Sequence, residues 1–233
     1  MVRLAEVGIG VAIQDQLYDS RRSCYYEKPV LRGWLHLALF QASLVVGTLV
    51  LTEVEGTARI VTAAVYAATV SGLFGTSALY HRGRWSERAS RVLQRADHLM
   101  IFFLIAGTAT PAFIIGLPGA TGIVGASVLW TFTLTLAVIH LFWMHAPEKL
   151  VGGTFIALGV AAGAALPAVW VHSGVPAGIL MLAGGALYIL GAVAYHWRWP
   201  DPVPSIFGYH EVFHTFVGLA AACQYVSIAV FVV

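Results

Sequence analysis

The chain has 233 residues, of which 59% are apolar and 10% are charged, whereas soluble domains hold about 45–50% apolar and about 25% charged residues. With a mean hydropathy of +0.81, this composition excludes a soluble fold. The near balance of 13 basic and 11 acidic residues argues against nucleic acid as a partner. Two cysteines cannot build a disulfide framework. The length suits one domain, which we expect to be an all-α membrane protein.

The first 32 residues are predicted to form a cytoplasmic N-terminal segment, followed by a seven-span domain over residues 33–233. The first twenty residues hold only a broken apolar stretch, with Glu6 and Asp15 as acidic neighbours. A signal peptide would instead have a basic start and a continuous apolar region. We therefore expect the chain to enter the membrane through its own first span.

Seven stretches after residue 32 are long and apolar enough to cross the ~30 Å hydrocarbon layer, which takes about 20 residues per helix. They are residues 33–51, 58–80, 98–117, 121–143, 151–171, 175–195 and 212–233. A basic loop at residues 82–95 separates the second and third spans, and a proline-rich join at 198–204 precedes the seventh. Within the third span, Gly107 and Pro111 predict either a kink that opens a pocket or a close helix contact.

The lysines and arginines indicate the orientation of the bundle. Twelve of the 13 fall on one side of the predicted spans, and Arg59 falls on the other. The positive-inside rule then places the N-terminus in the cytoplasm and the C-terminus across the cell membrane. This orientation is opposite to that of a G-protein-coupled receptor. A retinal Schiff base is excluded as well, because Lys28 and Lys149 both lie outside the spans.

Ionisable residues at the ends of spans point to a function, because such groups are costly in a membrane. His81 ends the second span, Asp97 precedes the third, and His210 and His214 lie at the start of the seventh. The topology brings all four to the cytoplasmic side. His210 and His214 share one helix face, as do Ser77 and His81. Three imidazoles with an open fourth position are typical of a catalytic zinc site, in which Asp97 would orient water and Ser77 would add a hydrogen bond.

Two other interpretations of these histidines stay open. Each also fits a hydrogen-bonded or half-solvated interface residue, and four more histidines map to the same side: His36, His140, His145 and His196. Residues 210–214 also read as H-E-x-x-H, the pattern of a zinc metalloprotease with Glu211 as general base. That pattern needs a third ligand downstream, where only Cys223 qualifies. Glu211 also fits a carboxylate at a helix N-terminus.

Three motifs taken in order resemble the hemolysin III family, the bacterial relatives of the progestin and adiponectin receptors. They are Ser77 with His81, Asp97 followed by the stretch 105–111, and His210 with His214. The resemblance covers nearly the whole seven-span region. The family's first motif is matched in part: Glu27 and His36 are present, but Arg32 stands where the family has asparagine.

This resemblance implies a zinc ion held by His81, His210 and His214, with Asp97 and Ser77 around a metal-activated water. It also implies kinship with membrane hydrolases such as the alkaline ceramidases. The expected function is then zinc-dependent hydrolysis of lipid amides or esters, with membrane lipids as partners and a role in lipid homeostasis. The alternative is a non-enzymatic protein, either a hemolysin-like pore or a receptor-like sensor, in which the zinc is structural. A pore would need a polar stripe along several spans, and the sequence shows no continuous one.

Overall fold

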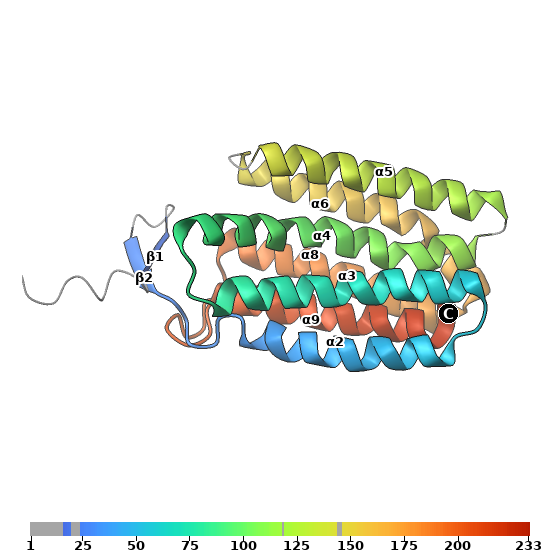
Figure 1. The fold of residues 1–233 in the computed structure, drawn as a ribbon, viewed down its shortest axis with the longest axis horizontal. Coiled ribbons are helices and arrows are strands. Elements are labelled where there is room, and N and C mark those ends of the chain that lie inside the picture. Colours follow the sequence, from blue (N-terminus) through green and yellow to red (C-terminus); the bar gives the residue numbers. More distant parts are fainter. Residues whose placement is uncertain (1–15, 20–23, 118, 144–145) are drawn as a thin grey trace, which may run out of the picture.

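The computed structural model describes residues 16–19, 24–117, 119–143 and 146–233. Within these ranges, seven helical spans are long and apolar enough to cross a membrane and lie lengthwise side by side (Figure 1). Their elements are α2 (Trp34–Glu53), α3 (Thr57–Arg82), α4 (Glu87–Gly116), α5 (Ala120–Phe142), α6 (Glu148–Ala162) with η2 (Gly163–Ala165) and α7 (Leu166–His172), α8 (Val175–Trp197), and α9 (Tyr209–Val226) with η3 (Ser227–Val232). The predicted all-α fold with seven spans is confirmed.

The largest difference from the predicted spans is the start of α4, which begins at Glu87 rather than at residue 98. The side chain of Ser86 accepts a hydrogen bond of 3.3 Å from the backbone N–H of Ala89, so Ser86 caps the helix. Glu87 adds an acidic side chain to the first turn, where the helix dipole favours it. Most of the basic stretch predicted as a loop is therefore the exposed first turns of α4.

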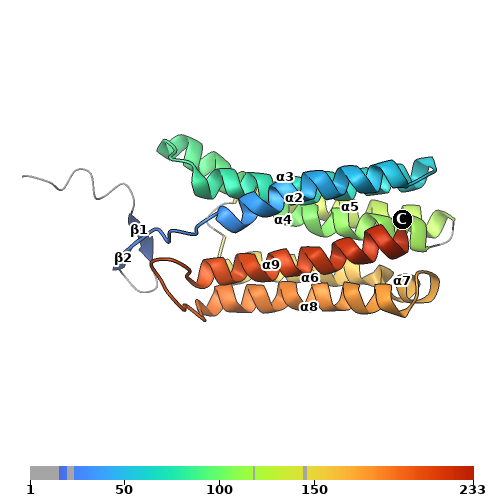
Figure 2. The same ribbon diagram turned by 90° about the horizontal axis from the view of Figure 1, so that it is seen from below.

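A short antiparallel pair of strands precedes the bundle, β1 (Gln16–Asp19) with β2 (Cys24–Glu27). Their sequences, QLYD and CYYE, are rich in the aromatic residues that favour strands. The pair lies beyond the end of the bundle (Figure 2) and leaves the all-α architecture of the spans unchanged.

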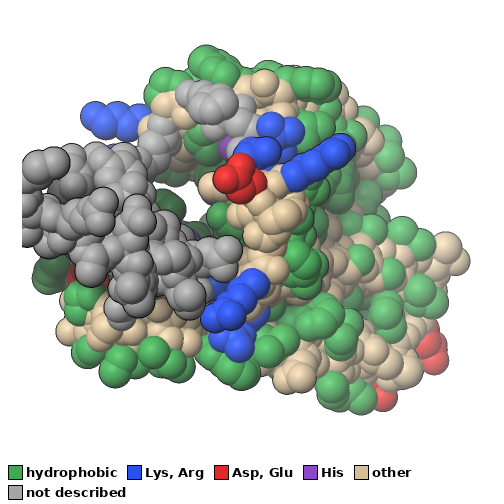
Figure 3. All heavy atoms as spheres, turned by 60° about the vertical axis from the view of Figure 1, so that its left-hand side comes forward, with side chains coloured by type: hydrophobic (Ala, Val, Ile, Leu, Met, Phe, Trp, Pro, Cys, Tyr) green, Lys and Arg blue, Asp and Glu red, His purple; other side chains and the backbone are tan. Residues whose placement is uncertain are grey.

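Positive charge gathers at the end of the bundle that carries β1 and β2. Figure 3 looks onto this end, where lysine and arginine side chains lie around the helix ends. Among the described lysines and arginines, only Arg59 lies near the opposite end, in the first turn of α3. The orientation of the bundle was predicted from this distribution of charge. That this end lies in the cytoplasm stays a prediction.

A close contact between α3 and α4 sets the position of the helices that carry His81 and Asp97. A Cβ atom added to Gly107 on α4 would lie 2.1 Å from Oγ1 of Thr69 on α3, far inside contact distance. Pro111 is buried within α4 without ending it. Of the two predicted roles for Gly107 and Pro111, the structure favours close packing.

Replacing Gly107 by Val is expected to destabilise the bundle by about 1–3 kcal/mol, because the added methyl groups would push α3 away from α4. Thermal unfolding of the detergent-purified protein measures this effect. The matched control is Gly153→Val on α6, where an added Cβ would meet nothing within 4 Å. Equal melting temperatures for the two variants would contradict the close contact.

Candidate metal site

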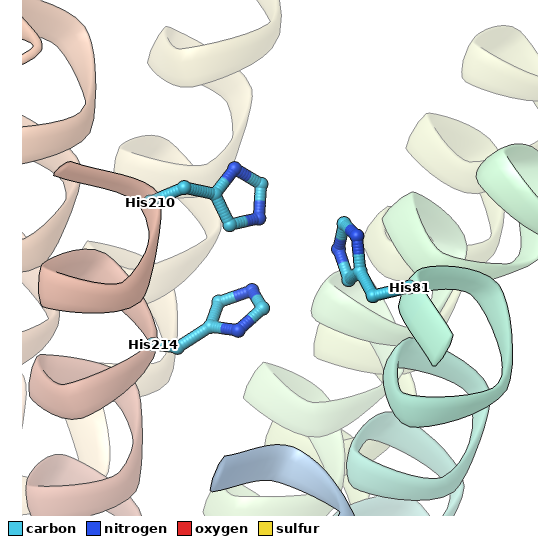
Figure 4. Close-up of side chains that lie close together, drawn as sticks. All are labelled: His81, His210 and His214. Carbon is cyan, nitrogen blue, oxygen red and sulfur yellow. The ribbon is translucent and has the colours of Figure 1, made fainter. Parts of the chain in front are cut away.

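Three histidines from two helices face one another at the end of the bundle next to β1 and β2. His81 comes from the last turn of α3, and His210 and His214 come from the first turns of α9. Figure 4 shows the two α9 rings directed toward the ring of His81. One nitrogen from each ring lies within 4.8 Å of the other two. The structure thus brings together the three histidines predicted to be metal ligands, across more than a hundred residues of chain.

The donor set of this cluster fits a metal ion. His81 and His214 are buried and His210 is half-buried. Within the described part of the chain, the buried Nε2 atoms of His81 and His210 have no hydrogen-bond partner. Tetrahedral zinc, with Zn–N distances of about 2.0–2.1 Å, holds its nitrogens about 3.4 Å apart. Binding an ion therefore requires the three rings to draw closer than they stand.

Asp97 and Ser77 lie beside the three histidines, as predicted. One carboxylate oxygen of Asp97, on α4, is 3.8 Å from Nε2 of His81. Ser77, one turn before His81 on α3, is buried, and its side chain hydrogen-bonds the Asp97 carboxyl group. The arrangement places one carboxylate, oriented by a hydroxyl, next to a cluster of imidazoles. Groups of this kind can hold a metal ion and move a proton beside it.

The comparison with known proteins agrees with these motifs. A family sequence model described as "Haemolysin-III related" matches residues 24–225. The chain belongs to the hemolysin III family. Hemolysin-3 of Bacillus cereus is 27% identical over 179 residues, which cover 76% of this chain and 78% of that protein. The Hemolysin-3 homolog of Bacillus subtilis (strain 168) is 25% identical over 158 residues, covering 68% and 71%. With its seven apolar spans, this hemolysin III protein is a multi-pass membrane protein.

Glu211, the second residue of the H-E-x-x-H pattern, is engaged through both carboxylate oxygens. One accepts a hydrogen bond from Nε of Arg32 in a buried ion pair. The other accepts from the backbone N–H of Gly208 at 2.9 Å and so caps α9. The predicted role as an N-terminal helix carboxylate is confirmed. A metalloprotease of this pattern needs a free glutamate and a downstream ligand, whereas here the third imidazole comes from α3, upstream. The site geometry therefore argues against the protease interpretation.

His36 is the residue at the site whose place could not be read from the sequence. Its ring stacks on that of His214, with ring centroids 3.7 Å apart and planes 12° apart. It is buried, and among the described residues neither ring nitrogen has a hydrogen-bond partner. The part-matched first motif of the hemolysin III family was the one available signal, since it contains Arg32 and His36. Arg32 and His36, two of the three positions of that motif, thus contact α9 next to its two histidines.

The other histidines in the described ranges lie outside the three-histidine group. His98 on α4 and His140 on α5 form an edge-to-face pair with centroids 5.6 Å apart. His172 lies at the opposite end of the bundle, where Nδ1 is 3.0 Å from the carbonyl oxygen of Ala168. His145 lies outside the described residues.

Proposed function

We propose that this hemolysin III protein is a zinc-dependent hydrolase of lipid amides or esters. The observation that carries the proposal is the cluster of His81, His210 and His214 with the Asp97 carboxylate 3.8 Å from one of its nitrogens. Three protein ligands that leave one position open are typical of catalytic zinc, whereas structural zinc sites are closed by four. A proton-accepting group beside such a cluster is what hydrolysis needs in addition.

The residues of the site divide the reaction between them. His81 and the α9 pair would hold the ion from two helices. A bound zinc ion supplies a Lewis acid and makes water a nucleophile near neutral pH. Asp97 accepts a proton from the attacking water and returns it to the leaving amine or alcohol, as the acyl carbon gains a hydroxyl group and its bond to nitrogen or oxygen breaks. Ser77 keeps the Asp97 carboxyl group oriented through their hydrogen bond.

The depth of the cluster favours a lipid as the substrate. His81 is the last residue but one of α3, and His210 is the second residue of α9, so the cluster lies at the terminal turns of the spans. In a bilayer, this is the level at which the amide or ester linkages of lipids join head groups to acyl chains. A membrane lipid would therefore present its cleavable bond at the height of the three imidazoles.

The test combines metal analysis with an activity screen. The full chain is purified in detergent, its zinc, copper and nickel contents are measured by plasma mass spectrometry, and fatty-acid release is followed in liposomes that contain a lipid ester or a ceramide-type amide. About one zinc ion per chain, with release that a chelator abolishes, would support the proposal. A well-folded preparation without stoichiometric metal would overturn it. Zinc without turnover would overturn the hydrolase and favour the non-enzymatic sensor or pore with a structural ion.

A further inference from the structure

The chain that leads into α2 is tied to both helices that carry the three histidines. Residues 30–36, here called segment 30–36, contain the last residues before α2 and its first turn. The backbone N–H of Val30 donates to the carbonyl oxygen of Ser205 at 3.0 Å, and that of Leu31 donates to Ile206 at 3.1 Å. These bonds fasten segment 30–36 to the loop directly before α9.

Two side chains of segment 30–36 reach α9 beside its histidines. Arg32 forms the buried ion pair with Glu211, which is the chain neighbour of His210. His36 stacks face to face on His214. An unpaired carboxylate next to His210 would be a competing metal ligand. The guanidinium of Arg32 pairs with the Glu211 carboxylate and so keeps it from competing. The stacked ring restricts the rotation of the His214 side chain.

Segment 30–36 also reaches the end of α3 that carries His81. Gly33 has a φ of +80°, and a Cβ atom added there would lie 2.8 Å from Cβ of His81. Only glycine combines this backbone conformation with so close an approach. The next residue, Trp34, lies under the guanidinium of Arg82, 3.8 Å from the ring centroid. Each side of the histidine cluster is therefore contacted by the same seven residues.

The contacts of segment 30–36 differ in kind from the packing along the rest of α2. His36 and Gly47 are the buried residues of this 20-residue helix, and its other side chains are exposed or partly buried. Farther along α2 the described polar contacts to other helices are neutral hydrogen bonds, between Ser43 and Ser71 and from the Tyr225 hydroxyl to the carbonyl oxygen of Val46. The buried ion pair and the stacked imidazoles are concentrated at the histidine cluster. This concentration points to a role at the site.

We propose that segment 30–36 is a positioning element, which keeps His81, His210 and His214 close enough together for the small ring movements that binding a metal ion requires. The proposal rests on the metal site of the proposed function and does not require hydrolysis. His36 acts through the face of its ring and not as a further metal ligand. Two imidazoles that bind one ion approach that ion from diverging directions, whereas the rings of His36 and His214 lie parallel. Arg32 acts by neutralising Glu211 and fixing the first turn of α9.

The rate of zinc loss to a chelator, measured on the detergent-purified full chain loaded with zinc, tests the role of His36. His36→Ala should release zinc at least about 10-fold faster, which is the scale for residues that orient metal ligands. His36→Phe keeps a flat ring and should stay within about threefold of the unmodified chain. His172→Ala, at the opposite end of the bundle, is the matched control. The melting temperature of the metal-free protein is recorded for each variant.

Two results would overturn the role of His36. One is a His36→Ala variant that releases zinc at the unmodified rate, even if its metal-free form melts earlier, because that pattern shows a structural residue only. The other is a His36→Phe variant as impaired as His36→Ala, because the ring nitrogens and not the ring face would then matter. An unmodified chain that holds no zinc overturns the metal site itself. A chain that holds zinc without turnover overturns only the hydrolase, and the zinc-release test proceeds unchanged.

The role of Arg32 is tested by relieving the charge that its loss would leave buried. Arg32→Ala should release zinc faster, and adding Glu211→Gln should recover most of the loss, because no unpaired carboxylate then lies beside His210. Arg32→Lys keeps the positive charge and replaces Arg32→Ala if the alanine variant does not fold. It should release zinc at the unmodified rate or, where Arg32→Ala folds, at least more slowly than that variant. Arg59→Ala, exposed at the opposite end, is the control. A double variant no better than Arg32→Ala would show that Arg32 does not act through Glu211.

Discussion

Replacing Asp97 by Asn is expected to lower the rate of lipid amide or ester hydrolysis by about 10²–10⁴-fold, while the zinc content stays near one ion per chain. Asparagine has nearly the same shape as aspartate and can keep the hydrogen bond to Ser77. It cannot take up a proton at the place where the carboxylate now lies, 3.8 Å from Nε2 of His81. The measurements are fatty-acid release by protein reconstituted in liposomes and metal content by mass spectrometry.

The matched control for this substitution is Glu87→Gln on the same helix. It makes the same chemical change in a side chain that is 92% exposed and lies ten residues earlier, so the rate should not change. A variant Asp97→Asn with full turnover would remove Asp97 from the reaction. Loss of zinc together with turnover would show that Asp97 serves to hold the metal site instead of moving a proton.

The fold could be predicted from the sequence because a membrane leaves few choices. Every span needs a run of about 20 apolar residues, and such runs stand out by composition alone. The start of α4 was missed because it depends on a local hydrogen bond to Ser86, and hydropathy carries no information on capping. The strand pair β1–β2 was missed because it lies outside the runs that hydropathy identifies.

The three histidines and Asp97 were predicted to meet because span ends on the same side of a membrane share one layer. Topology alone therefore brings residues 81, 97, 210 and 214 to the same height. The contacts of Arg32 with Glu211 and of His36 with His214 carry no comparable signal. Each joins residues about 180 positions apart, and whether two such side chains touch depends on how α2 rotates against α9. The same contact decides the meaning of Glu211, which the H-E-x-x-H pattern left ambiguous.

Replacing His81 or His214 by Ala is expected to lower the zinc content from about one ion per chain to near zero in either variant. Each substitution leaves two imidazoles, but the two variants leave them on different helices. His81→Ala keeps the pair on α9, whereas His214→Ala leaves one histidine on each of α3 and α9. Loss of zinc in both variants would require the ion to bridge the two helices. Plasma mass spectrometry on size-purified, folded protein measures the effect, with His172→Ala as a histidine control that should keep its zinc.

Thermal unfolding of the same variants separates a catalytic ion from a structural one. If zinc mainly braces α3 against α9, both variants should melt well below the unmodified chain, and chelation should lower the melting temperature of the unmodified chain to theirs. If segment 30–36 already holds the histidines in place, the metal-free bundle should melt only slightly below the zinc-loaded one, and turnover is the property that disappears. Zinc retained by His81→Ala would contradict both versions, because the ion would then not lie between the two helices that the structure brings together.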